Sequence, residues 1–473
     1  MAPAIDPSEA AERAFRDARA VEDAGDPLAA EAAYRTVLAR FPGDVRAANN
    51  LGMLLEARGL SDEAAALFHA ALERDPDALP VLMNLGALEH ARGRRDAAGA
   101  LYRRVLAADP DALPATMNLA RLHFDRAEFA EATALLERAA TQAPDEPAVQ
   151  TALGTVLFER GLPAEALARF ELALRLAPQD AEKHFHVARA LDALERTDEA
   201  IRSYRDSLAL DARSVVARER LARLLVVSGR REEAVAMMRR WLEEVPGQPV
   251  ATHFLASIGA DPAPARAADA YVRMVFDRFA DDFDTTLGRL HYRAPQLVVE
   301  ALQALAGEPK GDADVLDAGC GTGLCGPLLR PWARRLVGVD LSFGMLARAA
   351  GRGYDLLAQA ELTAFLAGRP AAWDLVASAD TLVYFGDLRD VLRAAASALR
   401  RGGGLVFTLE REEPGEAGAP YALQIHGRYR HRADYVEAAV RDAGLKLLAL
   451  SPVTPRWEAG QPVAGLLVCA AKG

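Results

Sequence analysis

Residues 314–323 have the sequence Asp-Val-Leu-Asp-Ala-Gly-Cys-Gly-Thr-Gly, and this stretch decides the fold of the C-terminal half of the chain. The apolar run at 314–318 predicts a short buried strand that carries an acidic residue, Asp317, near its end. The glycines that follow predict a tight turn in which the backbone can pass close to a ligand without Cβ clashes. A helical stretch is expected over 324–331, and the N–H groups at a helix start can meet an anionic group.

A second strand is predicted over 334–340 and ends at Asp340. An acidic residue at the end of the second strand is placed to accept hydrogen bonds from both ribose hydroxyls of a nucleotide-like ligand. The turn has the spacing GxGxG. It lacks the GxGxxG of nicotinamide dehydrogenases and the GK[ST] ending of P-loop NTPases, so neither class fits.

VLDAGCGTG (315–323) followed by VGVDLS (337–342) resembles motifs I and II of class I S-adenosylmethionine (SAM)-dependent methyltransferases. The resemblance implies an α/β Rossmann-like domain with a seven-stranded, mostly parallel sheet, and SAM as the cofactor. Further segments match the later strands of that fold, namely 354–362, 373–388, 399–410, 445–453 and 462–472.

The family's cofactor contacts carry over to residues that match its motifs. Asp317 and the loop that contains Gly319, Cys320, Gly321 and Gly323 would hold the methionine portion of SAM, and Asp340 would hold the ribose. Leu341 would stack on the adenine, and Glu361 would contact its amino edge, unless Glu361 is a surface carboxylate. Asp380, Leu382 and Tyr384 would face the methyl group and its acceptor. Cys320 is interpreted as a small residue in a tight loop rather than as a nucleophile.

A catalytic base is needed only if the acceptor must lose a proton. His431 and His426 are the candidates, because histidine titrates near neutrality, although both are also consistent with structural roles. Arg428, Arg430 and Arg432 alternate with aromatic residues in this segment, and they are expected either to bind an acidic acceptor or to form a solvated face. Arg456 and Glu458 are expected to form an ion pair near the same place. No metal site is expected, because the three cysteines lack metal-ligand spacing.

The stretch FDRFADDFD (276–284) precedes this core and resembles the N-terminal lid of many SAM methyltransferases. By that resemblance, Phe279, Phe283 or Tyr292 would cover the cofactor. A helix packed on a sheet edge would show the same aromatic residues.

The first half of the chain repeats with a period of 34 residues. In each unit a small residue is followed after 12 positions by alanine and after 16 by a large apolar residue, and six of the seven units have proline after 24. The small residues are Ala18, Gly52, Gly86, Ala120, Gly154, Ala188 and Ala222. The pattern predicts pairs of antiparallel helices that stack on one another. The small residue and the alanine allow close backbone approach, and the large residue is expected to fill the gap toward the next unit.

These units resemble tetratricopeptide (TPR) repeats, which implies an all-α solenoid whose concave face binds a protein or peptide. A dimerisation arm or a spacer remains the alternative. Residues 251–260 are expected to form a final solvating helix, and the proline-containing stretch 259–266 predicts a domain boundary. The expected domains are therefore 1–262 (repeats) and 263–473 (methyltransferase). The full arrangement resembles bacterial TPR-containing methyltransferases.

The net charge of −11 lies almost entirely in residues 1–262. An acidic repeat array repels phosphate backbones, so nucleic acid is not expected as a partner. The chain begins without a signal-peptide pattern and has no apolar run of about 18 residues, so a cytoplasmic protein without a membrane association is expected.

Three functions remain open from the sequence. The first is methylation of a protein or peptide recruited by the repeats. The second is methylation of a small molecule, with the repeats used for assembly. The third is a non-catalytic scaffold that binds SAM.

Overall fold

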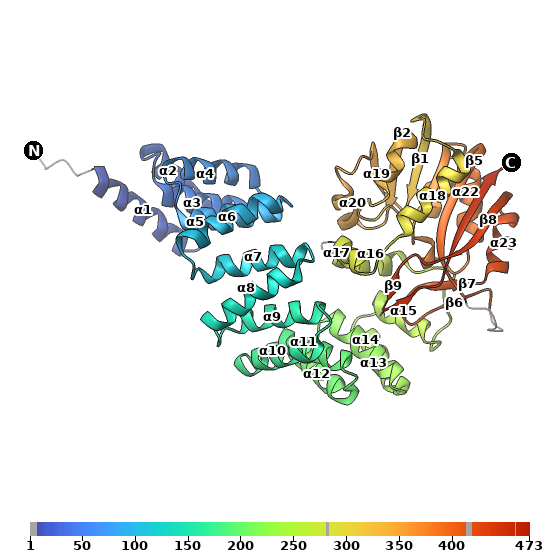
Figure 1. Ribbon diagram of the computed structural model, residues 1–473, viewed down its shortest axis with the longest axis horizontal. Coiled ribbons are helices and arrows are strands. Elements are labelled where there is room, and N and C mark those ends of the chain that lie inside the picture. The colour runs from blue at the N-terminus through green and yellow to red at the C-terminus, as the bar shows by residue number, and fades with distance from the viewer. Residues whose placement is uncertain (1–6, 281–282, 413–418, 459) are drawn as a thin grey trace, which may run out of the picture. The chain divides into compact units, whose positions relative to one another are not determined.

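The structure is a computed structural model, and it describes residues 7–280, 283–412, 419–458 and 460–473. These residues form two compact units, Met1–Ser214 and Val215–Gly473. The first unit is all-α, and the second combines three further helices with an α/β domain (Figure 1).

Twelve helices in six antiparallel pairs make up the first unit, as the 34-residue period predicts. Their bounds are α1 Pro7–Asp23, α2 Pro27–Arg40, α3 Val45–Ala57, α4 Ser61–Arg74, α5 Leu79–Ala91, α6 Arg95–Ala108, α7 Leu113–Asp125, α8 Phe129–Gln142, α9 Pro147–Glu159, α10 Pro163–Leu176, α11 Ala181–Ala193 and α12 Thr197–Leu210.

The large apolar residue of each repeat packs on the small residue of its own pair. A Cβ added to Gly52 would lie 2.5 Å from the ring of Phe68, and one added to Gly86 would lie 2.5 Å from the ring of Tyr102. The sequence predicted contact with the next unit, and that contact also occurs, because the ring of Phe170 stacks on His186 of the following pair. In these two repeats the aromatic ring occupies the space of the side chain that glycine lacks.

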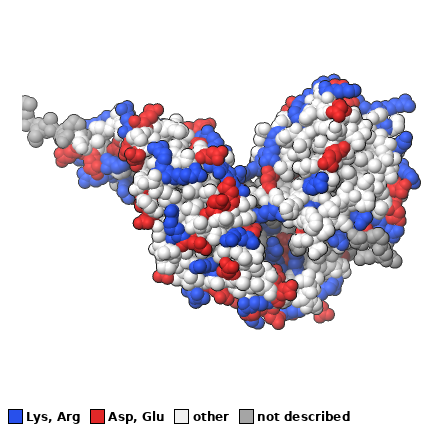
Figure 2. Space-filling model, viewed as in Figure 1, with Lys and Arg blue, Asp and Glu red and all other residues white. Residues whose placement is uncertain are grey.

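Charged side chains of both signs cover the first unit. Lys and Arg alternate with Asp and Glu over the face seen in Figure 2. Ion pairs between neighbouring repeats account for part of this mixing, such as Arg92 with Asp62 and Arg126 with Asp96. No described helix is long and apolar enough to cross a membrane.

Three helices that continue the repeats belong to the second unit: α13 (Val215–Val227), α14 (Arg231–Glu244) and α15 (Pro249–Ser257). The division into two compact units thus falls between two repeats, and the boundary at residues 262 and 263 stays a prediction. α15 is not a solvating helix, since six of its nine residues are buried. The ring of His253 in this helix stacks on Tyr271 at 3.8 Å, and its Nε2 donates to the carbonyl of Gly427 at 2.9 Å.

The α/β domain has a central sheet with the strand order β3-β2-β1-β4-β5-β11-β8. The first five of these strands are mutually parallel, and β11 runs antiparallel to both of its neighbours, which agrees with the predicted seven-stranded, mostly parallel sheet. The small strands β6 and β7 add to the edge near the end of β5. The strand bounds are β1 Ala313–Ala318, β2 Ala333–Asp340, β3 Leu356–Gln359, β4 Trp373–Ser378, β5 Leu399–Arg411, β6 Tyr421–Leu423, β7 Tyr429–His431, β8 Leu445–Val453 and β11 Gly465–Lys472, with the separate hairpin β9 Trp457–Glu458 and β10 Gln461–Pro462.

Helices cover the sheet and supply the walls of its core. Trp373 and Phe407 are buried with residues of α22 and α23 in one apolar cluster, whereas Val298 of α18 packs with Val315 and Leu336 in another. The helical bounds are α16 Asp269–Phe279, α17 Phe283–Arg289, α18 Ala294–Ala306, α19 Gly326–Leu329, η1 Arg330–Trp332, α20 Phe343–Ala349, α21 Leu362–Ala367, η2 Leu382–Tyr384, α22 Arg389–Ala398 and α23 Ala433–Asp442.

Replacing Gly86 by alanine is predicted to destabilise the repeats by about 1–3 kcal/mol, because the new methyl group overlaps the ring of Tyr102. Gly99 provides a matched control. Gly99 also lies in a helix, and the nearest atom to a Cβ added there would be an arginine nitrogen at 3.5 Å. Replacing Gly99 by alanine should therefore leave the stability unchanged or raise it by about 0.5–1 kcal/mol. Urea unfolding followed by circular dichroism measures both. Equal effects of the two substitutions would contradict the packing described for Tyr102.

Candidate functional site

The glycine-rich loop follows β1 and lies against the loop after β4. Gly319, Gly321 and Gly323 all have positive φ, at 79°, 53° and 88°. A Cβ on Gly319 would lie 2.0 Å from Oγ1 of Thr381, and this hydroxyl donates to the Gly319 carbonyl at 3.1 Å. A Cβ on Gly321 would instead meet only the ring of Phe283, at 3.9 Å. The first glycine therefore permits close packing, and the second leaves the backbone open toward a cavity.

Asp340, at the end of β2, is held by two backbone hydrogen bonds. Its Oδ2 accepts from the N–H of Gly321 and its Oδ1 accepts from the N–H of Ser342, each at 2.9 Å. Burial raises the pKa of Asp340 in spite of these bonds. The carboxylate lines the cavity, and each oxygen retains a second lone pair for a ligand.

Asp317, near the end of β1, is buried with one oxygen unsatisfied. Oδ2 accepts from the hydroxyl of Tyr354 at 2.6 Å, whereas Oδ1 has no hydrogen-bond partner. Burial raises the pKa of this carboxyl group to about 7, and Asp340 contributes in the same direction. Such a group is poised to accept a hydrogen bond or a positive charge from a ligand.

Leu341 and the segment after β3 form one side of the cavity, which Ala360, Glu361 and Leu362 also line. Glu361 caps α21, because its two oxygens accept from the N–H groups of Thr363 and Ala364 at 2.9 and 2.8 Å. The sequence analysis did not predict this cap. The cap orients the carboxylate at the cavity wall, so Glu361 is not a free surface carboxylate. Its contact with the adenine stays a prediction.

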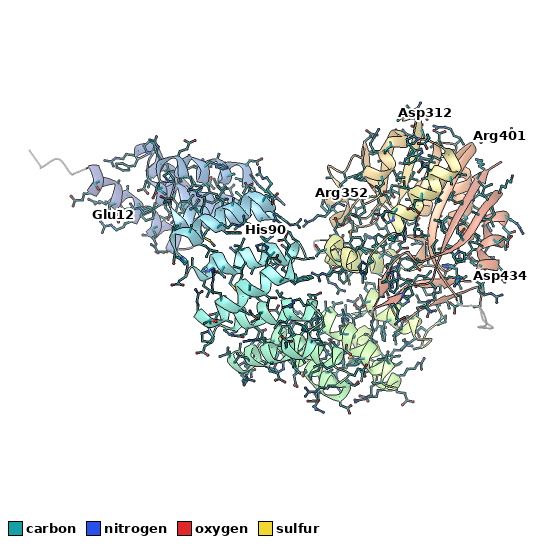
Figure 3. All side chains as sticks on the ribbon, viewed as in Figure 1. Glu12, His90, Asp312, Arg352, Arg401 and Asp434 are labelled. Carbon is teal, nitrogen blue, oxygen red and sulfur yellow. The ribbon has the colours of Figure 1, made fainter. Side chains whose placement is uncertain are left out.

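The lid helices α16 and α17 are tied by their aspartates to the start of α20 and to the glycine-rich loop. Asp277 accepts from the hydroxyl of Ser342 at 2.5 Å and from the N–H of Gly344 at 3.2 Å. Asp284 accepts from the hydroxyl of Thr322 at 2.5 Å and pairs with Arg352, which Figure 3 labels. The two aspartates of the FDxxAxxFD stretch therefore fasten the lid, a role that the sequence analysis did not assign to them.

The aromatic residues of the lid divide into two groups. Phe276, Phe283 and Tyr292 line the cavity. Phe279 is 44% exposed and is not part of the cavity wall, so its predicted role as a cover is wrong.

The loop after β4 closes the other end of the cavity. Asp380 has a positive φ of 53°, its Oδ1 accepts from the hydroxyl of Thr408, and its Oδ2 accepts from Arg456 at 2.5 Å. Tyr384 packs edge-on against Phe276, with ring centroids 5.4 Å apart, and lines the cavity. Burial raises the pKa of Tyr384, so its phenol is neutral at physiological pH.

The stretch predicted as a linker is part of the same wall. The N–H of Ala267 donates to the carbonyl of Tyr384 at 2.8 Å, and the N–H of Gly386 donates to the carbonyl of Ala265 at 2.9 Å. Arg266, held between these bonds, lines the cavity.

The structure does not bring the two candidate histidines to the cavity. His431 is fully buried, its Nε2 donates to the carbonyls of Phe385 and Gly386, and burial lowers its pKa to about 4. His426 lies beside Glu410 and lines a different cavity, and burial also lowers its pKa to about 4. The prediction that either histidine serves as a catalytic base at this cavity is therefore not supported.

The expected pair of Arg456 and Glu458 is present at 2.7 Å, but it belongs to a larger buried network. Arg456 also pairs with Asp380 and Glu410, while Arg428 pairs with Glu410 and Glu458. These residues come from four separate stretches of the chain, so no local sequence pattern announces the network.

Cys320 and Cys325 line the cavity as buried thiols. Burial raises the pKa of both, which keeps them protonated and unreactive. This agrees with the interpretation of Cys320 as a small residue in a tight loop.

The cavity that these elements enclose contains about 930 Å³ of empty volume, including the solvent at its mouth. Its walls are mainly apolar, and the carboxylates of Asp340, Glu361 and Asp380 are the anionic groups among its described lining.

Comparison with known proteins places this cavity in a methyltransferase domain. Residues 289–450 match the family model of that domain, and residues 15–78, 55–112, 89–155 and 193–258 match models of the tetratricopeptide repeat. The chain carries tetratricopeptide repeats and a methyltransferase domain. Methyltransferase domains of this kind generally use a SAM-type methyl donor, and tetratricopeptide repeats generally mediate protein–protein interactions.

Curated relatives are similar to the methyltransferase domain over short stretches. Human methyltransferase-like protein 27 is 49% identical over 80 residues, which are 16% of this chain and 32% of that protein. The ubiquinone biosynthesis O-methyltransferase of Bordetella avium (strain 197N) is 29% identical over 166 residues, which are 32% of this chain and 68% of that protein. The chain thus spans about a third of the human relative's length.

Among solved structures, one described as a functional characterisation of Pseudomonas aeruginosa pilF is 23% identical. It covers 45% of this chain and 96% of its own chain, with a TM-score of 0.39.

Asp317→Asn is predicted to stabilise the methyltransferase domain at alkaline pH. The raised pKa means that the folded state binds the proton more tightly than the unfolded state does. The carboxyl group therefore costs stability as the pH rises from about 4 through about 7. Asparagine keeps the bond to Tyr354 without the buried charge. The melting temperature should rise by on the order of 5 °C at pH 8 and change little at pH 4.

Thermal unfolding of wild type and variant between pH 4 and 8 measures this difference. Asp390→Asn, at an exposed position on α22, is the control. A difference between Asp317→Asn and wild type that does not grow with pH would show that Asp317 is not an unsatisfied buried acid.

Proposed function

We propose that the second unit binds SAM in the cavity described above and transfers its methyl group to an acceptor. The observation that carries the proposal is the pair of acidic residues at the ends of β1 and β2. Asp317 has an unsatisfied oxygen, and Asp340 is fixed by Gly321 and Ser342 with lone pairs to spare. Asp340 lines the cavity and suits a ribose, whereas Asp317 is buried just before the glycine-rich loop and is not among the lining residues.

Each part of the cofactor has residues suited to it. Asp340 would accept from the ribose hydroxyls, and Asp317 with the Gly319–Gly323 backbone would hold the methionine portion. Leu341 supplies an apolar surface for the adenine, and the capped carboxylate of Glu361 would accept from its amino group. Bound SAM supplies a methyl group on a sulfonium, which is already an activated leaving group.

The remaining work of the protein is to align the acceptor and to exclude water. The lid covers the cavity with Phe276, Phe283 and Tyr292, and Asp277 and Asp284 fasten it. The neutral phenol of Tyr384 is suited to donate a hydrogen bond to the acceptor rather than to remove its proton. Because Asp380 is committed to Arg456 and Thr408, we expect an acceptor that does not depend on a strong protein base.

We propose that the acceptor is a protein or peptide recruited by the tetratricopeptide repeats, since repeats of this kind generally bind proteins. A small-molecule acceptor is the second candidate. It is favoured by the enclosed, aromatic cavity and by the name of the Bordetella relatives, which are ubiquinone biosynthesis O-methyltransferases. A SAM-binding scaffold without catalysis is the third candidate.

Asp340→Asn is predicted to weaken SAM binding by at least tenfold, because it replaces an oxygen that faces the ribose by an amide nitrogen. Isothermal titration calorimetry with SAM at up to millimolar concentration measures the affinity. Asp390→Asn, far from the cavity wall, should bind SAM like the wild type. If wild type releases no heat of binding with SAM, the proposed function fails.

The nature of the acceptor is tested by adding the purified protein and tritiated SAM to a cell lysate and separating macromolecules from small molecules. Label that depends on Asp340 is expected in the protein fraction. Asp340-dependent label confined to small molecules would exclude the protein acceptor and favour the second candidate. SAM binding without any transferred label would favour the scaffold.

A further inference from the structure

A second cavity lies at the C-terminal end of β5, and no function has been assigned to it above. Its walls are Glu410, Arg411, His426, Arg430, Glu458 and residues 461–464. None of these residues lines the cofactor cavity. Arg456 connects the two, because it pairs with Asp380 in the wall of the cofactor cavity and with Glu410 in the wall of this one.

Glu410 is fully buried and has one unsatisfied oxygen. Oε1 accepts from Arg428 at 2.5 Å and from Arg456, but Oε2 has no hydrogen bond. Burial favours the neutral acid, yet the guanidinium groups of Arg428 and Arg456 hold the pKa of Glu410 below its ordinary value. Nε2 of His426, another residue of the cavity wall, lies 3.4 Å from Oε2 without the geometry of a hydrogen bond, so Oε2 remains an available acceptor there.

Arg430 faces the same cavity, and among the described residues its side chain forms a long ion pair with Glu410 but no hydrogen bond. It is the register partner of Glu410 on the adjacent strand β7, so both side chains project from the same face of the sheet. Its Nε lies 3.9 Å from Oε2 of Glu410, beyond hydrogen-bond distance. Arg428, by contrast, pairs with Glu410 and Glu458, and Arg432 pairs with Asp434 at the surface.

The spacing and charge of this pair indicate what fits between them. Nε of Arg430 and Oε2 of Glu410 are 3.9 Å apart. A group that bridges them from the cavity must accept a hydrogen bond from Nε and donate one to Oε2. A hydroxyl oxygen does so with a single atom, and a primary carboxamide does so with adjacent oxygen and nitrogen atoms. A carboxylate could accept from Arg430 but has no proton to donate to Oε2 of Glu410. An ammonium could donate to Oε2 but cannot accept from Arg430.

We propose that this second cavity binds a neutral hydroxyl or primary carboxamide group on the part of the acceptor remote from the methylated atom, with Arg430 donating to it and Glu410 Oε2 accepting from it. The binding of such a group in this cavity does not depend on the proposed function. Only the statement that the group belongs to the methyl acceptor depends on it. The proposal replaces the expectation that three arginines bind an acidic acceptor, because all three pair with carboxylates of the chain, Arg430 at the longest distance.

Trp457 provides a reporter of this cavity. It lies in β9 next to Glu458, opposite Pro462 of β10, and it is 44% exposed. The other three tryptophans, Trp241, Trp332 and Trp373, are buried. Acrylamide quenching of the full-length protein therefore reports mainly on Trp457.

The test titrates the full chain, without SAM, with three probes and follows the quenching of Trp457. N-acetyl-glutamine methylamide represents a carboxamide, methyl β-glucoside represents a hydroxyl source, and N-acetyl-glutamate methylamide is the charged isostere of the first. We expect saturable protection by at least one neutral probe, and at least tenfold weaker binding of the glutamate probe. The stronger of the two neutral probes identifies the source.

Arg430→Gln should weaken the neutral probe at least tenfold. Arg432→Gln, two residues along the chain and next to Asp434 (labelled in Figure 3), should have no effect. Circular dichroism establishes that both variants are folded. The proposal is overturned if neither neutral probe saturates, which is the result expected of a cavity that holds only water. It is also overturned if the glutamate probe binds as well as the neutral probes, or if Arg430→Gln binds the neutral probe like the wild type. Since SAM is absent, a failure here is separate from a failure to bind SAM.

Discussion

The carboxylate of Asp340 accepts from the backbone of Gly321 on one side and from the backbone of Ser342 on the other, and the geometry of the cofactor cavity depends on these two bonds. The first fixes the glycine-rich loop relative to β2, and the second fixes the start of α20. The hydroxyl of Ser342 caps that helix and also donates to Asp277 of the lid. One carboxylate therefore sets the positions of a loop, a strand, a helix and, through Ser342, the cover of the cavity.

A second constraint is the buried network around Arg456, which is 4% exposed and contacts three carboxylates. Removal of one member of such a network leaves a buried charge without compensation, which typically costs 3–5 kcal/mol. The network holds Asp380 in its left-handed conformation at the cavity wall, and it fixes Glu410 with one oxygen toward the second cavity. The two cavities are thus separate in their linings but share the residues that orient their walls.

Periodic and local features of the chain could be predicted from the sequence. The repeats follow from a fixed spacing of small and large residues, and the resemblance of the segments around Asp317 and Asp340 to methyltransferase motifs implied the parallel sheet. Features formed by distant residues could not be predicted. Arg456 meets Asp380 and Glu410 only in the folded chain, and His431 proves to be a buried donor to two carbonyl groups. The packing of α15 on the methyltransferase domain was missed for the same reason, because His253 meets Tyr271 and Gly427 only in the folded chain.

The central claim is that the loop after β1, the end of β2 and the lid together enclose a SAM-type cofactor. Amide hydrogen exchange of the full-length protein, followed by mass spectrometry with and without millimolar SAM, tests it most directly. The account predicts slower exchange in peptides that cover 317–323, 340–345 and 271–292, because the ligand and the closed lid restrict their opening. Unchanged exchange in all three segments, or protection confined to residues 7–214, would contradict it.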